Sequence, residues 1–171
     1  MITFFMIDKD LENLPRLARE VKKESIKYFN RLKKRPPKRL DLLMQEIHEE
    51  EFKTTDCLTC ANCCKTTSPM FTYKDIERIA KYLKMKVADF VSQYLRIDED
   101  DFHVLKSSPC PFLDENDNSC FIYEVRPKAC AEYPHTNRKK FIQLTNLTIK
   151  NTEVCPATYR IVEELKKRLP N

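Results

Sequence analysis

The chain has 171 residues, of which 42% are hydrophobic and 33% are charged. This composition excludes a disordered chain and predicts a globular protein with one domain, or with one domain and an appendage. No stretch approaches the roughly 18 apolar residues of a membrane span, and the first residues lack the basic start of a secretory signal, so we expect a cytoplasmic protein.

Charge is unevenly distributed along the chain. The formal net charge is +5, whereas residues 1–40 alone hold twelve Lys or Arg and five Asp or Glu, a balance of +7. The most basic segment, RLKKRPPKR, covers residues 31–39 and is typical of surfaces that bind nucleic acid, anionic lipid or an acidic protein. No base-stacking aromatic residues are interleaved with it, and a solvated helix end is the alternative explanation.

The first part of the chain is predicted to form a helical hairpin. Between residues 10 and 35 apolar side chains recur every three or four positions, which indicates an amphipathic helix with Pro15 in its first turn and Pro36–Pro37 at its end. A second helix is expected over residues 39–52. Its apolar face holds Leu40, Leu43, Met44 and Ile47.

A cysteine-rich loop over residues 53–71 precedes a second pair of helices. Thr72 and Asp75 stand three residues apart at the start of a periodic apolar segment, as in a capping box. After a break at LKMK, the next helix is expected to turn Val87, Phe90, Val91 and Tyr94 inward. We expect this pair to be core scaffold without chemistry of its own.

The remainder of the chain is predicted to combine short strands, loops and a final helix. Residues 102–106, 119–123 and 141–149 have the composition of strands. Pro156 is expected at the first position of the last helix, which makes Cys155 its N-cap, where the helix dipole favours a thiolate.

These elements predict a mainly helical α+β fold. It comprises a basic helical hairpin over residues 1–52 and a cysteine-rich, metal-organised domain over residues 53–171. Because the chain contains no Gly, turns with positive φ are expected to fall to Asn or Asp, with Asn62 and residues 114–118 as candidates.

Eight cysteines carry the main functional signal. In a reducing cytoplasm they favour metal binding, and a disulfide framework is the alternative for an even number. The run CLTCANCC spans residues 57–64, and its C-x2-C-x2-C spacing lets three thiolates of one loop approach one metal centre. The predicted ligands are Cys57, Cys60, Cys63, Cys64, Cys110, Cys120, Cys130 and Cys155.

The metal and the grouping of the ligands stay open at this level. Three local thiolates with a distant Cys-Pro, as at Cys110 or Cys155, suit an iron–sulfur cluster, in the first place [4Fe–4S], whereas zinc more often takes two separated C-x2-C pairs. Neighbouring side chains point in different directions, so Cys63 and Cys64 are predicted to separate two ligand sets, with Cys64 joining the dispersed cysteines. A single four-cysteine site, with the other thiols buried as small apolar groups, is the alternative.

Few other side chains are candidates for the site. Lys65, Arg126 and Lys128 lie close in sequence to cysteines, where they would offset thiolate charge or remain ordinary surface cations. Of the three histidines, His135 is the best candidate ligand, whereas His48 lies among glutamates and is expected to face solvent. The sequence contains no recognisable arrangement for nucleophilic catalysis and no glycine-rich phosphate loop.

Several motifs together resemble the YkgJ-type CxxCxxCC cysteine-cluster family, which is described as zinc- or iron-chelating. They are the C-x2-C-x2-C-C run, CPFL at residues 110–113, and C-x-I-Y-E-x-R-P-x-x-C over residues 120–130, followed by Tyr133–Pro134. The resemblance covers roughly residues 53–157 and implies metal binding without a defined reaction. Arg126 and Tyr133 are predicted to contact the cofactor or to shape its loop.

The sequence departs from the family pattern at two places. Ala61–Asn62 stands where the family carries a Gly beside its cysteines, and Asn62 is expected to adopt the left-handed conformation there. LKMK replaces the usual LGLS between the paired helices, which is expected to affect a helix cap and no ligand.

The predicted function is therefore chelation of an iron–sulfur cluster or zinc by most of the cysteines. A more distant resemblance to the cysteine-rich part of flagellin lysine methylases makes a cluster-dependent redox or protein-modifying enzyme the first alternative. A zinc-stabilised, nucleic-acid-associated module is the second. Whether any reaction is catalysed is left open.

Overall fold

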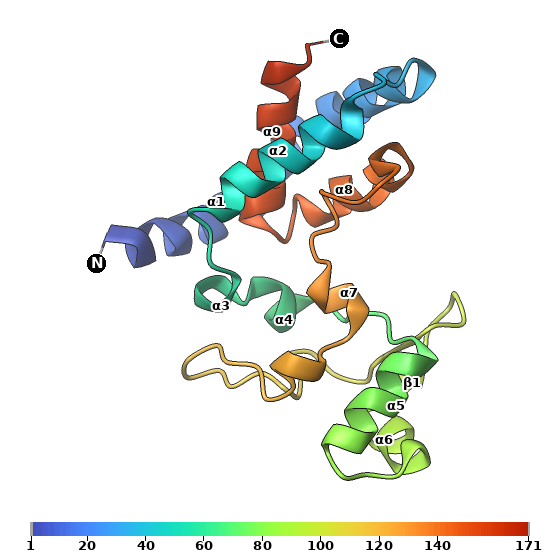
Figure 1. Cartoon of the computed structure of the whole chain (residues 1–171). Helices are drawn as coiled ribbons and strands as arrows, with labels where there is room; N and C mark the ends of the chain where they lie inside the picture. The colour runs from blue at the N-terminus through green and yellow to red at the C-terminus, as the bar shows by residue number, and fades with distance from the viewer. Residues whose placement is uncertain (1, 171) are drawn as a thin grey trace. The chain divides into compact units, whose positions relative to one another are not determined.

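The computed structural model describes residues 2–170, with side chains from residue 11 onward. The fold is mainly helical α+β, as predicted, and the described residues contain one two-stranded sheet. The chain forms two compact units (Figure 1): unit 1 combines residues 1–57 and 134–171, and unit 2 comprises residues 58–133. The sequence predicts a domain boundary between residues 52 and 53. Whether the two parts fold independently stays a prediction.

Unit 1 is helical throughout its regular structure. Its elements are α1 (Ile2–Lys34), α2 (Leu40–Phe52), the 3₁₀ helix η2 (Phe141–Leu144), α8 (Thr145–Asn151) and α9 (Pro156–Arg168). The helix α1 ends before the Pro36–Pro37 pair, as predicted, but it begins at Ile2, so the prediction that Pro15 occupies its first turn is wrong. No helix-breaking residue separates the apolar start of the chain from Leu11, so the helix extends to it and Pro15 becomes an interior residue that lacks one N–H donor.

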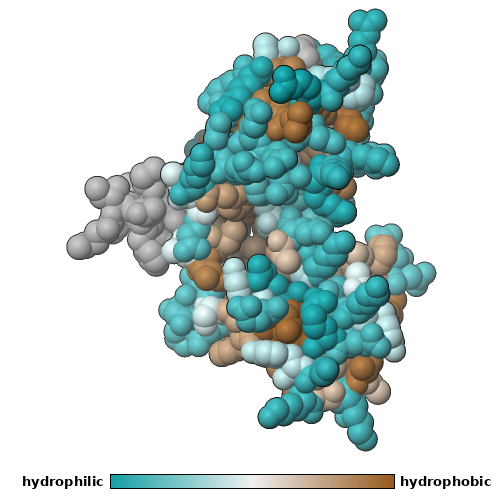
Figure 2. Space-filling view, in the orientation of Figure 1, coloured by the Kyte–Doolittle hydropathy of each residue, from teal (hydrophilic) through white to brown (hydrophobic). Residues whose placement is uncertain are grey.

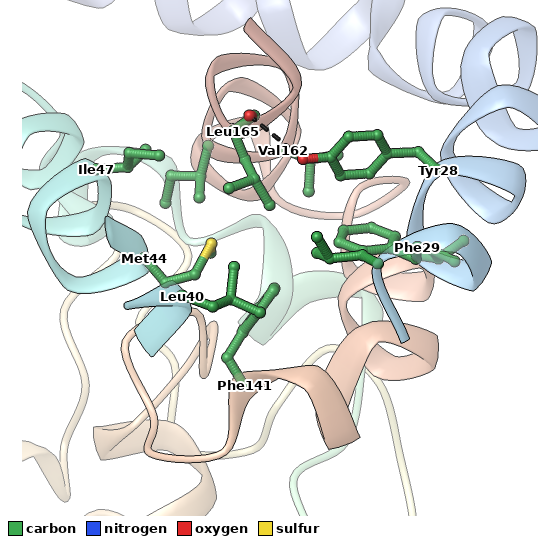
Figure 3. Close-up of a cluster of buried hydrophobic side chains, with 11 residues drawn as sticks. Tyr28, Phe29, Leu40, Met44, Ile47, Phe141, Val162 and Leu165 are labelled. Atoms are coloured by element: carbon green, nitrogen blue, oxygen red, sulfur yellow. Dashed lines mark hydrogen bonds between the residues drawn. The ribbon is translucent and has the colours of Figure 1, made fainter. Parts of the chain in front are cut away.

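The core of unit 1 is formed where α1 and α2 pack against α9, and Figure 1 shows α9 lying against α2. Figure 3 shows Tyr28 and Phe29 of α1 opposite Leu40 and Met44 of α2, with Phe141 completing the cluster. Leu32, Ile47, Ile149, Ile161, Val162 and Leu165 also belong to it. The two helices of the predicted hairpin are thus joined through the C-terminal helix, because their apolar faces share it.

Polar contacts fix the ends of these helices. The Tyr28 hydroxyl donates to the carbonyl oxygen of Leu169 at 2.9 Å, and burial raises the pKa of Tyr28 to about 12. The Arg160 guanidinium lies 2.6 Å from Glu51 Oε1 and donates to Thr55 Oγ1 at 3.1 Å. These contacts attach the segment that leads into the cysteine run to the first turns of α9.

Unit 2 contains several short elements around a small core. They are α3 (Cys57–Cys60), which begins at the last residue of unit 1, then α4 (Asn62–Thr66), α5 (Tyr73–Tyr82), α6 (Val87–Tyr94), β1 (Leu95–Ile97), β2 (His103–Leu105), η1 (Tyr123–Val125) and α7 (Lys128–Ala131). The strands are antiparallel, with Leu95 opposite Leu105. The core consists of Phe71, Ile76, Ile79, Ala80, Phe90, Leu95, Leu105, Phe112 and Ile122.

The predicted helix pair of unit 2 is confirmed. Thr72 caps α5: its Oγ1 accepts the N–H of Asp75 at 3.2 Å, and Asp75 Oδ2 accepts the N–H of Thr72 at 2.9 Å. At the other end of α5, the N–H of Met85 donates to Ala80 O and that of Lys84 to Lys81 O, which is a Schellman motif. Lys84 holds its left-handed position with φ 56°.

Two of the three predicted strand segments are wrong. Residues 141–149 form η2 and α8, and their buried positions Phe141, Thr145, Thr148 and Ile149 follow helical spacing instead of alternation. In residues 119–123 only Cys120 forms a bridge, to Leu113, before the chain turns into η1. The prediction for residues 102–106 is confirmed by β2. Its partner strand β1 is not predicted from the sequence.

Six non-glycine residues adopt positive φ within the described chain: Ala61, Lys84, Asp101, Asn118, His135 and Lys140. Asn118 and Asp101 follow the expectation for a chain without Gly. In the cysteine run, however, Ala61 takes the left-handed conformation with φ 46° and Asn62 begins α4, so the prediction for Asn62 is wrong. A left-handed Asn62 would stop α4 before Cys63, whereas a left-handed Ala61 separates two short helices.

Hydrophilic side chains cover most of the face shown in Figure 2, with apolar residues scattered among them. This agrees with the large charged fraction of the sequence. Among the described helices, none combines the length and the apolar character that a bilayer crossing requires.

Candidate metal centre

The cysteine run folds into two short helices joined at Ala61. Because Ala61 is left-handed, α3 ends at Cys60 and α4 begins at Asn62, so Cys63 and Cys64 lie in the first turn of a new helix. The N–H and the hydroxyl of Thr67 both donate to Cys63 O, at 3.0 and 2.8 Å. These bonds end α4 and fix the backbone that carries the adjacent cysteines.

The CPFL segment is held against α4 by backbone contacts. The N–H of Cys110 donates to Cys64 O at 2.8 Å, and the Ser108 hydroxyl donates to Lys65 O at 2.7 Å. The chain then turns back on itself, since the N–H of Phe121 donates to Phe112 O at 2.9 Å, beside the bridge between Leu113 and Cys120. Cys110 and Cys120 are therefore brought to the same end of this turn, next to Cys64.

Cys130 reaches the same region through the buried carboxylate of Asp75. Asp75 Oδ1 accepts the N–H of Lys128 at 3.1 Å, which fixes the start of α7, two residues before Cys130. The Arg78 guanidinium lies 2.6 Å from Asp75 Oδ1 and donates to the carbonyl oxygen of Arg126 at 2.9 Å. Burial opposes ionisation of Asp75, but its hydrogen bonds with Thr72, Arg78 and Lys128 outweigh burial and lower its pKa.

The thiols of unit 2 interact electrostatically. Burial is the largest cause that raises the pKa of Cys110 to about 11 and that of Cys130 to about 12, and the pKa of Cys120 is also raised. In all three cases the charge of Cys64 raises the pKa further, so ionisation of Cys64 opposes ionisation of the other three thiols. Cys64 itself has a pKa lowered to about 7, chiefly by a hydrogen bond from Cys63 and also by Lys65.

Cations next to the cysteines divide into two kinds. Lys65 lowers the pKa of Cys64, and Arg126 lowers those of Cys120 and Cys130, so both act on thiols as expected for charge compensation. The Arg126 guanidinium also lies over the Tyr123 ring, 3.8 Å from its centre, and donates to Tyr123 O at 2.7 Å. Lys128 instead pairs with Glu132 at 3.6 Å and remains a surface cation.

The other predicted ligands lie at different places in the chain. Cys57 is exposed and ends the first segment of unit 1, and Cys60 is the partly buried last residue of α3. Cys155 belongs to unit 1 and is the N-cap of α9, as predicted, where its Sγ accepts the N–H of Thr158 at 3.4 Å. Burial raises its pKa, whereas the hydrogen bonds of Thr158 and Ala157 at the N-cap and the charge of Arg160 act in the opposite direction.

The remaining candidates have mixed outcomes. His48 is half-buried, with its Nδ1 2.7 Å from Thr136 Oγ1, so the prediction that it faces solvent is wrong. It lies on the same side of α2 as Ile47 and Met44, and its ring packs on Phe52. The backbone N–H of Tyr133 donates to Cys130 O at 3.3 Å, and His135 has a left-handed backbone with φ 66°. Their roles as ligand or cofactor contact stay predictions.

The sequence does not reveal which residues position Cys130 and Cys110. Asp75 was recognised only as a cap, although it is 1% exposed and also binds the start of α7. Arg78 and Ser108 received no role. The available signal is an acid in a capping box with an Arg three residues later. The sequence does not show what this pair binds, because the backbone groups of Arg126 and Lys128 that contact it lie about fifty positions away.

The chemistry of the donor set fits a metal cation. Cys64, Cys110, Cys120, Cys130 and Cys155 take part in no disulfide among the described residues. Across the same residues, no three His, Cys, Asp or Glu side chains are already gathered as a group that could hold one ion. Because each thiolate disfavours ionisation of its neighbours, a bound cation would promote their deprotonation together.

Comparisons with known proteins relate the cysteine-containing part of the chain to one family. The family model named CxxCxxCC, described as "Putative zinc- or iron-chelating domain", matches residues 56–156. The uncharacterized protein MJ0661 of Methanocaldococcus jannaschii is 34% identical over 91 residues, which are 52% of this chain and 49% of that protein. The chain thus spans about half the length of this curated relative, and no solved structure matches. Since the family model covers more than half of the sequence, the chain belongs to the CxxCxxCC family of zinc- or iron-chelating domains.

Proposed function

We propose that the protein chelates a metal centre through the thiolates of Cys64, Cys110, Cys120 and Cys130. The observation that carries the proposal is electrostatic: Cys64 raises the pKa of three thiols that come from three other segments of unit 2. Thiols that oppose one another's ionisation are stabilised as thiolates by a shared cation. Arg126 and Lys65 would offset part of the negative charge that remains.

Of the candidate metals, we propose an iron–sulfur cluster first and zinc second. Four thiolates from dispersed segments, one of them a Cys-Pro, suit a [4Fe–4S] cluster, and the same four would also suit tetrahedral zinc. When bound, the centre supplies cross-links between α4, the turn at Cys110 and Cys120, and α7. All four cysteines are partly accessible to solvent, which an electron-transfer role for a cluster would require.

The adjacent cysteines give the proposal a second part. Cys57, Cys60 and Cys63 remain predicted ligands of a separate set, and Cys155 remains a predicted ligand without an assigned set. The hydrogen bond between the Cys63 and Cys64 thiols brings the two sets into contact. A centre shared by both sets is therefore the competing arrangement.

The first experiment identifies the metal. The full chain is purified without oxygen, and its iron, zinc and acid-labile sulfide are measured together with the visible absorption spectrum. Iron and sulfide with broad visible absorption support the cluster. A colourless protein with stoichiometric zinc replaces the cluster by a zinc–thiolate site, and a metal-free protein that retains eight reduced thiols overturns the proposal.

A second experiment tests the ligand assignment. Cys64→Ser, Cys110→Ser, Cys120→Ser and Cys130→Ser are each expected to lose the same fraction of bound metal, whereas Cys63→Ser is expected to lose a different fraction. Ser92→Ala serves as a control, because it removes an exposed hydroxyl of α6 in unit 2 without removing a thiol. If Cys63→Ser and Cys64→Ser lose the same metal equally, a single shared centre is the better description.

A further inference from the structure

Two basic segments that are distant in sequence meet in unit 1. The carboxylate of Asp41, at the start of α2, accepts the N–H of Lys140 at 2.7 Å and that of Phe141 at 3.1 Å. Phe141 is fully buried and lies beside Leu40 in the core (Figure 3). Since Arg39 precedes Leu40 and Lys140 precedes Phe141, these contacts place residues 138–140 next to the end of the basic segment 31–39. We call residues 31–41 and 138–140 together the basic surface.

The basic surface concentrates the positive charge of the protein. It contains nine Lys or Arg and one acid, Asp41, a formal charge of +8, whereas the whole chain carries +5 and the rest of it therefore −3. All nine cationic residues are exposed. Lys33 Nζ donates to Asn146 Oδ1 of α8 at 3.0 Å, which extends the surface toward that helix.

Six of the nine cations of this surface form no ion pair with the part of the chain whose side chains the structure describes. Among the described residues, no ion pair includes Lys34, Arg35, Lys38, Arg39, Lys139 or Lys140. Some exposed cations elsewhere in unit 1 are paired, for example Lys22 with Glu153 at 2.7 Å. Like charges at this density repel one another, whereas the Asp41 carboxylate and the buried Phe141 hold the two segments together.

We propose that the basic surface binds the phosphate backbone of a nucleic acid. Clustered Lys and Arg side chains replace the counterions of a polyanion, and the release of these ions drives binding that does not depend on base sequence. The exposed amides of Asn137, Gln143 and Asn146 accompany the cations and are further phosphate donors. Because the basic surface contains no aromatic residue, it offers no platform for stacking bases.

An anionic membrane is the less favoured polyanion. Peripheral helices that bind membranes combine cations with a continuous apolar face. The large apolar residues exposed on the described part of unit 1 are Ile26, Leu42 and Leu147, and each belongs to a different helix. The surface therefore has the charge for a lipid headgroup layer without the apolar face that would insert into it.

The test uses the full chain as purified and a fluorescent 24-base-pair duplex of mixed sequence, as DNA and as RNA. Binding is measured by anisotropy from 50 to 300 mM salt. The variants are Lys38→Gln/Arg39→Gln and Lys139→Gln/Lys140→Gln, one pair in each segment. The matched control is Lys81→Gln/Lys84→Gln, which removes two exposed charges of unit 2.

We expect the wild type to bind one or both duplexes with an affinity that falls steeply as salt increases. Each variant pair in the basic surface should weaken binding by about fivefold or more and reduce the slope of log affinity against log salt by about two, whereas the control should match the wild type. The proposal is overturned if neither duplex binds at 50 mM salt, if the control loses as much as the variants, or if only one segment contributes. It is also overturned if vesicles containing phosphatidylserine, or polyglutamate, bind and the duplexes do not.

Discussion

At the residue scale, the absence of Gly has a local energetic consequence. A left-handed conformation costs a non-glycine residue about 1–2 kcal/mol. Lys84 occupies such a position at the C-terminal end of α5, where LKMK replaces the LGLS of the family, and it does so at the place in a Schellman motif that Gly favours most. The departure seen in the sequence thus affects a helix cap, as expected, and the structure identifies which residue is strained.

Lys84→Gly is therefore expected to increase the free energy of unfolding by about 1 kcal/mol, because Gly adopts positive φ without a steric penalty. The measurement is urea denaturation followed by circular dichroism at a constant metal content. Lys81→Gly is the matched control: Lys81 is exposed within α5, where Gly is expected to cost about 1 kcal/mol. Equal effects of both substitutions would contradict the assignment of strain to Lys84.

His48 is the second residue whose environment has a measurable effect. Burial lowers its pKa below 6.5, and the charge of Glu49 opposes this only in part. When the pKa of a histidine is lower in the folded than in the unfolded protein, its contribution to stability is present at pH values above the unfolded-state pKa. The contribution is lost as the pH falls through the folded-state pKa. We expect stability to decrease as the pH is lowered from about 7 to 5, since His48 must become charged in a half-buried position.

His48→Gln should remove this part of the pH dependence and should cost about 1 kcal/mol at pH 7.5 through the hydrogen bond to Thr136. The measurement is denaturation of wild type and variant at pH 5 and pH 7.5. His103→Gln, in the strand β2 of unit 2, controls for loss of a histidine as such. If the stability of His48→Gln depends on pH as strongly as that of the wild type, other groups cause the pH dependence.

At the scale of elements, one buried carboxylate connects helices that the sequence presents as separate. Asp75 caps α5, pairs with Arg78 and binds the start of α7. Its predicted role in the capping box was correct but incomplete, because a cap is a local property and α7 is about fifty residues away in the sequence. The helix pair that was predicted to be scaffold alone therefore positions one of the candidate ligands.

Asp75→Asn is expected to destabilise unit 2 by about 2–3 kcal/mol, because it weakens several hydrogen bonds to a buried charge. Asp89→Asn provides the comparison, since Asp89 lies exposed in the first turn of α6 and its loss is expected to cost less than about 1 kcal/mol. Both are measured by chemical denaturation. If the substitution at Asp75 costs no more than that at Asp89, the connection between α5 and α7 contributes little.

At the scale of the molecule, apolar packing is unequally distributed. Unit 1 has a continuous core built by α1, α2 and α9. In unit 2 the core centres on α5, α6 and the two strands, whereas the segments that carry Cys60, Cys63, Cys64, Cys120 and Cys130 contribute few residues to it. Under the proposed function, a metal would supply the cross-links that apolar contacts do not supply there.

Removal of the metal by a chelator is therefore expected to increase hydrogen exchange in residues 58–68 and 118–133, by about tenfold or more. Exchange in α2 and α9 should stay unchanged, because their core is apolar. Segment-resolved exchange measured by mass spectrometry checks both expectations. Full protection of residues 58–68 and 118–133 after metal removal would contradict a role of the metal in folding.

Most helices could be predicted from the sequence because their signals are local. Apolar spacing, the Pro36–Pro37 pair, the Thr72 cap and Pro156 each act within a few residues, and the structure confirms them. The segment 141–149 was misread because its apolar residues fit both alternation and helical spacing. Only its packing against α1 and α2, through the buried Phe141, favours the helix.

The sequence by itself determined the family and the mainly helical fold, and it predicted the cysteines as metal ligands, because motif spacing and periodicity are properties of consecutive positions. Only the tertiary structure decided that the N–H of Cys110 donates to Cys64 O, that Asp75 positions α7, and that two basic segments meet at Asp41. These relations join residues that are about fifty to one hundred positions apart. They depend on how the core packs, which no local pattern specifies.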